Sequence, residues 1–345
     1  MDRCVLIPSY RPDQTLLQTI ASMQAVGFTK IVVVDDGSGP VYASIFNEAE
    51  ANGATVLHHT VNMGKGRAMK TGFCHILEAF PQCTAVTVDG DGQHKAEDAW
   101  KAANLAAEYP HALILGCRDF SRQESIPLPN LIGNLSTKAA FFLLTGIRFT
   151  DTQCGLRAYP PALMRTACGI SGDRFEFESN TLLAVRAKKL QVVEFPITVH
   201  YEPKEDYVTT YRKGTDSARI LRCLMDFSLF PLLFGLLSSL LVLTLTNAFS
   251  GSETLLGILA GAGVTVGKLL LALCSVKKLA LTFHALESGI VYGALFMLLC
   301  ALGCSAVGAF WILFVPFALL SYPLYRMLNY GRCPRRIRVR SRHCA

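Results

Sequence analysis

A nearly charge-free second half constrains this chain more than any other feature. Residues 227–249 carry no charged side chain, residues 254–276 carry one, and residues 288–325 carry none. A helix that crosses a bilayer needs about 20 apolar residues. The last run is too long for one helix. Together with the apolar residues before it, it is long enough for two helices, separated near Gly303. The pattern therefore predicts an all-α domain of four membrane-spanning helices over residues 227–325, at 227–248, 254–275, 281–302 and 305–325.

The charge distribution predicts how these helices are oriented. The formal net charge is +7, and residues 326–345 contain seven arginines and no acid, so this basic tail accounts for all of it. Basic segments next to spans stay on the cytoplasmic side, and Lys277 and Lys278 follow the second expected span. Four spans then place both termini in the cytoplasm. We expect an integral membrane protein whose partner is the lipid bilayer, with no nucleic-acid partner.

The first half alternates strand-like and helix-like segments, as βαβ units do. The expected strands are Cys4–Ile7, Lys30–Val34, Ala54–Leu57, Ala85–Val88, Leu113–Gly116 and Val192–Phe195. The expected helices are Gln14–Val26, Val41–Asn52, Gly66–Phe80 and Ala96–Tyr109. This order predicts an α/β domain over residues 1–215 with a doubly wound, mostly parallel sheet. Residues 216–226 have the apolar spacing of an interfacial amphipathic helix leading into the first span.

An acidic loop, Asp89–His94, follows the apolar run at 85–88. Its two aspartates, at positions i and i+2 with glycines beside them, would lie at the carboxyl edge of the sheet, where open α/β folds bind ligands. Oxygen ligands suit Mg²⁺ or Mn²⁺ held together with a nucleoside diphosphate. Asp and Gly are also common in ordinary turns. The loop alone therefore leaves two interpretations, a metal site and a simple turn.

Five motifs in order decide between them. They are Val5–Tyr10, Val33–Ser38, Asn62–Gly66, Asp89–His94 and Asp151–Ala158. The series resembles the family 2 glycosyltransferases of the dolichol-phosphate mannosyltransferase type over about residues 1–225. The resemblance implies a GT-A fold and an inverting, metal-dependent transfer of a sugar from a UDP- or GDP-linked donor to a polyprenyl phosphate at the cytoplasmic membrane face. The four spans resemble a GtrA-like membrane domain, which some members carry fused.

The resemblance also assigns a donor pocket by position. Asp36 would accept a hydrogen bond from the nucleotide base, and Pro8, Ser9 and Tyr10 would line that pocket. Lys65 would touch the diphosphate, although an ordinary loop lysine is an equal alternative. The nucleotide-sugar donor is thus expected over the first two motifs.

The same resemblance places the metal and the catalytic pocket. Asp89, Asp91 and Gln93 would bind Mg²⁺ or Mn²⁺, and the metal would in turn bind the diphosphate. The residues expected around the reacting groups are Asp91, Arg118, which would meet the acceptor phosphate, Asp151 and Arg157.

The acceptor determines whether a general base is needed. A phosphate monoester has its second pKa near ~6, so a polyprenyl phosphate is already anionic at pH 7. Catalysis then requires alignment and electrostatic stabilisation of the leaving diphosphate. Many members carry arginines where this chain has Pro129, Asn130 and Leu131, with Lys138, Arg212, Lys213 and Arg219 as candidate substitutes.

Two other functions remain open. A hydroxyl acceptor, on a glycolipid or a glycan, would need a base, and Glu176 or Glu178 would supply it; alternatively these acids only favour a helix start through its dipole. The chain would instead be a component that moves a lipid-linked sugar if the membrane half carried the activity. The sequence leaves the oligomeric state, including a homo-oligomer, open.

Overall fold

The computed structural model of this chain describes residues 2–118, 134–138, 141–142, 148–188, 190–198, 214–220, 258–266, 278–305, 308–309, 312–313 and 336–339. The chain divides into two compact units. The first comprises Met1–Leu143, Ile147–Leu224 and Pro334–Ala345, and the second comprises Leu144–Gly146 and Met225–Cys333. The first unit therefore contains both the expected transferase domain and the end of the chain.

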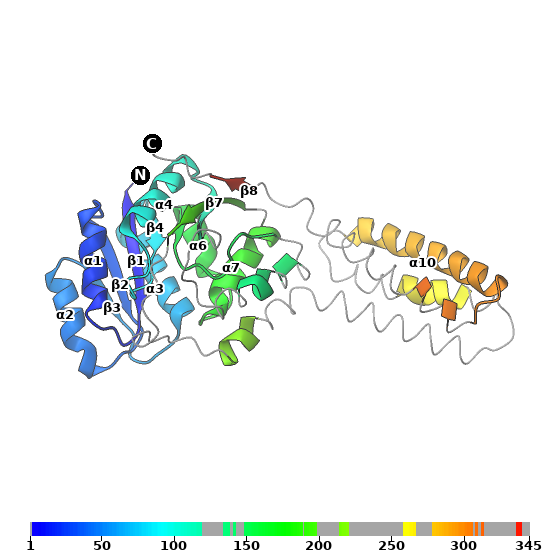
Figure 1. Ribbon diagram of the computed structural model, residues 1–345, viewed down its shortest axis with the longest axis horizontal. Coiled ribbons are helices and arrows are strands. Elements are labelled where there is room, and N and C mark those ends of the chain that lie inside the picture. The colour runs from blue at the N-terminus through cyan, green and yellow to red at the C-terminus, as the bar shows by residue number, and fades with distance from the viewer. Residues whose placement is uncertain are drawn as a thin grey trace. The chain divides into compact units, whose positions relative to one another are not determined.

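The first unit is built on a mixed sheet with helices on both faces (Figure 1). Its strands are β1 (Arg3–Ser9), β2 (Lys30–Asp35), β3 (Thr55–His58), β4 (Thr84–Thr87), β5 (Ala112–Arg118), β6 (Arg157–Tyr159), β7 (Gln191–Ile197) and β8 (Arg336–Arg338). Its helices are α1 (Thr15–Ala25), the 3₁₀ turn η1 (Pro40–Tyr42), α2 (Ala43–Ala51), α3 (Lys65–Ala79), α4 (Ala96–Glu108), α6 (Pro161–Cys168) and α7 (Glu176–Ala187). Six of these strands and four of these helices match the expected segments within a few residues, which confirms the doubly wound α/β domain.

The sheet runs in the order β3-β2-β1-β4-β6-β5-β7-β8. Only β6 is antiparallel to its neighbours, β4 and β5, among the strands described. Since β4 and β5 both run against β6, they are parallel to each other and to the first three strands. The carboxyl ends of β1, β2, β4 and β5 consequently share one edge of the sheet. This edge collects the loops that carry the expected site residues.

Alternate strand residues feed two apolar layers, because successive side chains point to opposite faces. Val5 and Ile7 join the buried cluster formed with α1, α2 and α4. Leu6 faces the other way, toward α3, where it lies so close to Gly72 that a Cβ there would overlap its methyl carbons. This contact fixes α3 against β1 and so positions the start of α3 beside the loops at the sheet edge.

The basic tail contributes a strand, which the sequence analysis did not anticipate. β8 pairs in parallel with β7, with Ile337 opposite Val193, and Figure 1 shows it in dark red beside β7. Ile337 and Val339 pack against the main core, and the backbone N–H of Val339 donates to the carbonyl of Glu194 at 2.9 Å. Two apolar residues among the arginines are enough to complete a short edge strand.

The described part of the second unit contains the helical segment 258–266 and α10 (Lys278–Ala301). These helices meet at glycines: a Cβ on Gly261 or on Gly289 would overlap the other helix. The buried residues around this contact are Ala260, Val264, Tyr292, Phe296, Cys300, Ala309 and Leu313. Among the residues that the structure describes, no helix is both long enough and apolar enough to cross a membrane.

The expected spans are therefore tested only in small part. The third, 281–302, coincides with α10 as a helix, and the second contains the helical segment 258–266. The first span lies outside the described residues, and the fourth lies largely outside them. Of the expected interfacial helix 216–226, residues 216–220 are described and are helical.

The strand pairing of the tail predicts a measurable effect on stability. Val339→Asp should lower the free energy of unfolding of the first unit by roughly 1–3 kcal/mol, because it places an unpaired charge against the apolar core. Val41→Asp makes the same substitution where the valine is 83% exposed, and it should change that free energy by less than about 0.5 kcal/mol. Denaturant unfolding of both variants checks this, and equal effects would show that the tail does not dock.

Candidate functional site

The expected donor residues lie together at the carboxyl edge of the sheet. Ser9 ends β1 beside Asp35 at the end of β2, and the backbone N–H of Asp36 donates to the carbonyl of Ser9 at 2.8 Å. Asp36 is buried, with 3% of its surface exposed, while Pro8 and Tyr10 are half-buried. The structure thus brings the first two motifs together as expected.

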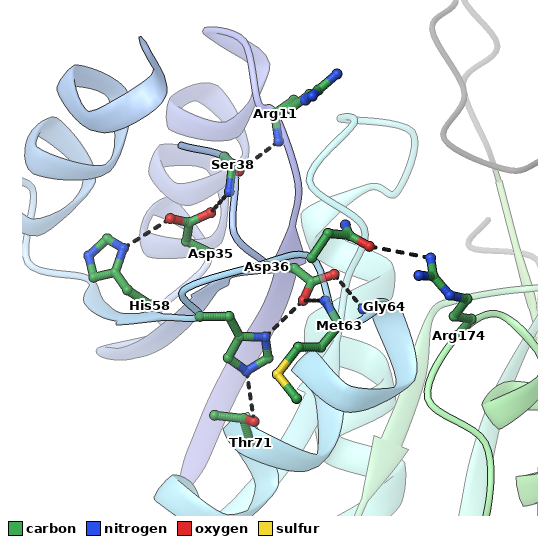
Figure 2. A network of polar contacts seen from close by, with 11 residues as sticks. Arg11, Asp35, Asp36, Ser38, His58, Met63, Gly64, Thr71 and Arg174 are labelled. Carbon is green, nitrogen blue, oxygen red and sulfur yellow. Dashed lines mark hydrogen bonds and ion pairs between the residues drawn. The ribbon is translucent and has the colours of Figure 1, made fainter. Parts of the chain in front are cut away.

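Asp36 organises the loop before α3. One carboxylate oxygen accepts the backbone N–H of Met63 at 2.9 Å and lies 2.8 Å from Nδ1 of His59, and the other accepts the N–H of Gly64 at 2.7 Å (Figure 2). The ring of His59 in turn contacts the hydroxyl of Thr71 at 2.9 Å. Both oxygens of Asp36 therefore hold the protein's own backbone, which fixes where α3 begins.

The preceding aspartate holds the other side of the same turn. Asp35 accepts the backbone N–H of Ser38 at 2.9 Å and contacts Nδ1 of His58 at 3.0 Å. The hydroxyl of Ser38 accepts the N–H of Arg11 at 2.8 Å, and Arg11 has a left-handed backbone with φ of 52°. The consecutive aspartates thus fasten two separate loops to the end of β2, as Figure 2 shows.

The acidic loop and the start of α3 meet in a cluster of charges. Nζ of Lys65, the first residue of α3, lies 2.6 Å from Oδ1 of Asp89 and 3.0 Å from Oε1 of Glu178. Nε2 of His94 lies 3.5 Å from the second oxygen of Asp89. The side chains of Lys65 and Glu178 are 17% and 11% exposed. One ammonium group therefore joins the acidic loop to the start of α7.

The charges of this cluster shift one another's protonation. Burial by itself lowers the pKa of Lys65, but the carboxylates of Asp89 and Glu178 outweigh it and raise this pKa. Burial raises the pKa of Asp89, but Lys65 and then His94 outweigh it and lower this pKa. Desolvation, followed by the negative charge of Asp89, raises the pKa of Asp91. Lys65 and Asp89 are thus both held in their charged forms.

Asp91 differs from Asp89 in its surroundings. It lies on the exposed part of the loop, where one carboxylate oxygen accepts the backbone N–H of Gln93 at 3.2 Å. Gln93 is half-buried. The loop thus carries one exposed carboxylate, Asp91, and one partly buried carboxylate, Asp89.

Packing explains why the Asp151–Ala158 motif has a glycine at position 155. A Cβ at this position would overlap the carboxylate of Asp89, so the backbone of the Asp151–Ala158 motif lies directly against that side chain. Its neighbour in the sheet supports the contact, because the hydroxyl of Thr87 in β4 donates to the carbonyl of Gly155 at 2.8 Å. Two motifs more than 60 residues apart, at 89 and 155, therefore form one wall of the site.

The two acids after β6 take different roles. Oε1 of Glu176 accepts the backbone N–H groups of Asp173 and Arg174 at 3.1 and 3.2 Å, so Glu176 caps the turn into α7. Glu178 instead faces Lys65. The turn also closes over α3, where Asp173 accepts from Lys70 at 3.1 Å.

The expected acceptor residue is paired with an acid in this structure. Arg118 ends β5, and its Nε and Nη2 donate to the two oxygens of Asp151 at 2.6 and 3.0 Å. Burial raises the pKa of Asp151, but Arg118 outweighs it and lowers this pKa. The helical residues 134–138 join this region through Gln153, whose side chain donates to Thr137 at 3.1 Å. The positions of the replaced arginines, 129–131, lie outside the described residues.

Arg157 lies beneath the site. It is 1% exposed, and its guanidinium donates to the backbone carbonyls of Cys154 and Glu178 at 3.0 and 2.9 Å. These bonds tie the 151–158 segment to the start of α7. In this structure Arg157 therefore supports the residues that carry Gly155 and Glu178.

Comparison with known proteins identifies the family. Residues 4–167 match the model described as glycosyl transferase family 2. The chain is 30% identical over 201 residues to an uncharacterized protein of Methanocaldococcus jannaschii, covering 57% of this chain and 81% of that protein. The chain belongs to glycosyl transferase family 2. It is therefore a transferase enzyme, and its sheet and helices form the GT-A-like α/β domain.

Two relatives of this glycosyltransferase have names that include dolichyl phosphate. One is the UDP-N-acetylglucosamine–dolichyl-phosphate N-acetylglucosaminyltransferase of Methanococcus voltae, 28% identical over 214 residues, covering 57% of this chain and 85% of the relative. Another is the dolichyl-phosphate beta-glucosyltransferase of Saccharomyces cerevisiae, 25% identical over 226 residues, covering 57% and 66%.

Sequence reasoning missed three contacts of this glycosyltransferase. It gave His59 no role, although His59 contacts Asp36. It did not pair Lys65 with Glu178, and it did not assign Arg157 to the backbone beneath the site. The sequence contained a usable signal only for Glu178. Residues two apart in a helix point about 200° apart, so Glu176 and Glu178 had to contact different neighbours.

The contact between Gly155 and Asp89 predicts a loss of transfer. Gly155→Ala should lower the rate of sugar transfer by tenfold or more, to roughly a hundredfold, because small displacements of a positioning group are costly. The free energy of unfolding should fall by only about 1–3 kcal/mol. Gly169→Ala is the matched control, since the nearest atom to a Cβ there is 3.7 Å away, and it should leave transfer unchanged. Full activity in Gly155→Ala would contradict the proposed packing.

Proposed function

We propose that this glycosyltransferase transfers a sugar from a UDP- or GDP-linked donor to a polyprenyl phosphate, with inversion and with Mg²⁺ or Mn²⁺. One observation carries the proposal: two carboxylates, Asp89 and Asp91, and a lysine at the start of α3 converge at the sheet edge beside Asp36. A metal-bound nucleoside diphosphate requires carboxylates that bind the metal and a positive group that binds the phosphates. This edge of the sheet carries both.

The donor set of the acidic loop fits a hard divalent cation. Desolvation, and after it the negative charge of Asp89, raise the pKa of Asp91, and a cation bound between the two carboxylates would offset that repulsion. Asp89, Asp91 and Gln93 offer only oxygen ligands, as Mg²⁺ and Mn²⁺ prefer. Bound there, the metal would neutralise charge on the leaving diphosphate. Lys65 would add a further positive charge beside it.

An acceptor phosphate agrees with the surroundings of Arg118. Its guanidinium lies at the end of β5, at the same sheet edge as the acidic loop, and is oriented by Asp151. A guanidinium binds phosphate through paired hydrogen bonds, which orients the nucleophile as well as attracting it. An anionic nucleophile needs no general base. The names of the two characterised relatives support a dolichyl-type phosphate as the acceptor class.

A membrane location is supported by the second unit. Its described helices expose the apolar side chains of Ile258, Val266, Leu286, Ile290, Val291, Leu295, Leu298, Leu302 and Ile312. They also contact each other through glycines, as helices within bilayers do. β8 adds a constraint, because the chain on both sides of residues 225–333 belongs to one sheet. If that segment crosses a membrane, it crosses an even number of times, which agrees with four spans of GtrA-like type and cytoplasmic ends.

A hydroxyl acceptor is the second candidate, and Glu178 is the observation that favours it. Its carboxylate lies in the same charge cluster as Asp89, within the site where a base would be needed. We favour Glu178 over Glu176 for that role, because Oε1 of Glu176 caps the turn before α7.

A transfer assay tests the proposal. Membranes containing the protein, a panel of radiolabelled UDP- and GDP-sugars, and added polyprenyl phosphate should give one label that becomes lipid-soluble, and excess EDTA should abolish the transfer. Asp91→Ala should lower the rate at least about a hundredfold, because it removes stabilisation of the leaving group, while the protein stays folded since Asp91 is exposed. Full turnover in EDTA or in Asp91→Ala would contradict the metal role.

The same assay separates the two acceptors. Glu178→Gln should retain transfer to polyprenyl phosphate within about tenfold, because a phosphate nucleophile needs no base. Loss of transfer by about a hundredfold or more, the upper part of the contribution of a general base, would favour the hydroxyl acceptor instead.

Sidedness is tested by labelling. In a variant whose native cysteines are replaced, a cysteine introduced at Ser252, between the first two expected spans, should react with a membrane-impermeant maleimide from outside the cell. A cysteine introduced at Ser341 in the basic tail should not react until the membrane is permeabilised. External labelling of Ser341→Cys in intact cells would contradict the cytoplasmic location of the tail.

A further inference from the structure

Lys65 occupies the place where a metal and a diphosphate would meet. Its ammonium group lies 2.6 Å from Asp89 and 3.0 Å from Glu178, and it is mostly buried. Asp89 has no second positive partner of comparable strength among the described residues, because His94 lies farther away, at 3.5 Å. In the donor-free site, Lys65 is therefore the cation that Asp89 binds.

A divalent cation and Lys65 compete for the same carboxylate. A metal bound to Oδ1 of Asp89 would lie about 2.0–2.1 Å from it, on an oxygen that already contacts the ammonium. Two positive groups on one oxygen repel each other strongly where water is largely excluded. Metal binding to Asp89 is thus opposed as long as Lys65 stays in place.

A diphosphate relieves this conflict. Lys65 is the first residue of α3, and the start of a helix favours phosphate groups. Its long, flexible side chain can turn from a carboxylate to a nearby phosphate oxygen without movement of the backbone. The backbone before Lys65 is held by the N–H groups of Met63 and Gly64, which donate to Asp36, and it turns into α3 at Gly64, whose φ is 104°.

We propose that Lys65 couples metal binding to donor binding: it pairs with Asp89 when no donor is bound, and it moves to the donor diphosphate when the metal binds Asp89. The inference rests on the proposed function and adds that Lys65 links the binding of the metal to the binding of the donor. Metal alone then binds weakly, and the nucleoside diphosphate strengthens it. By thermodynamic linkage the metal strengthens nucleotide binding by the same factor.

Metal binding measured without catalysis tests the coupling. The free Mn²⁺ signal in electron paramagnetic resonance reports binding to the whole chain with and without UDP or GDP, after correction for Mn²⁺ held by nucleotide in solution. In the wild type the nucleotide should raise Mn²⁺ affinity about tenfold or more, within the usual 5–150-fold range of coupling. Lys65→Met should bind Mn²⁺ alone about tenfold more tightly than the wild type, and its coupling should be about tenfold smaller than the wild-type coupling, although the diphosphate still supplies ligands to the metal.

Two variants serve as controls. Lys65→Arg keeps the positive charge and should keep weak binding of Mn²⁺ alone. Lys70→Met makes the same substitution on the same helix, at a lysine that contacts Gly172 and Asp173 at 2.8 and 3.1 Å, and it should leave the coupling unchanged. If Lys65→Met unfolds because Glu178 loses its partner, the double variant Lys65→Met, Glu178→Gln removes the unpaired charge and carries the same expectation.

The outcomes separate this inference from the proposed function. A wild-type chain that binds no Mn²⁺ even with UDP or GDP contradicts the metal dependence on which both rest. A wild-type chain that binds Mn²⁺ with nucleotide, together with a Lys65→Met chain of unchanged metal affinity and unchanged coupling, overturns the role of Lys65 alone.

Discussion

The ion cluster around Asp89 is the interaction on which the site depends. Its carboxylate is attached to α3 through Lys65 and lies against the backbone at Gly155. Lys65 also joins it to α7 through Glu178. Three elements that are distant in the sequence thus meet at one side chain at the end of β4. Two of these contacts are ionic and the third is the close approach of the Gly155 backbone.

The motifs of this glycosyltransferase are connected physically as well as in order along the chain. Asp36 holds the backbone of Met63 and Gly64, and these residues directly precede Lys65. The position of the ammonium group beside Asp89 is therefore set from the end of β2. Arg157 also stabilises this cluster, because its guanidinium donates a hydrogen bond to the backbone carbonyl of Glu178. Residues expected to touch ligands thus also build the frame that places other ligand-binding groups.

The sequence predicted what continuous apolar runs and spacing determine. Buried parallel strands such as β1 and β2 contain uninterrupted apolar segments. The ends of β2 and β4 position Asp36 and Asp89 at the same edge of the sheet. β6 and β8 were missed because each has three residues and begins with an arginine, so neither has a recognisable apolar run. Arg157 was expected at the catalytic pocket because its motif lies there, and that expectation stays a prediction. Its burial and its two carbonyl partners are tertiary contacts, which the sequence does not show. The contact of the basic tail with β7 was hidden for the same reason.

The most direct measurement of the central claim is a structure of the chain with Mn²⁺ and the nucleoside diphosphate of its donor, with the metal located by its anomalous scattering. The account predicts a Mn²⁺ peak within ligand distance of Asp89 or Asp91, and a Lys65 ammonium that has left Asp89 for a phosphate oxygen. A peak away from the acidic loop, with Lys65 still bound between Asp89 and Glu178, would contradict it.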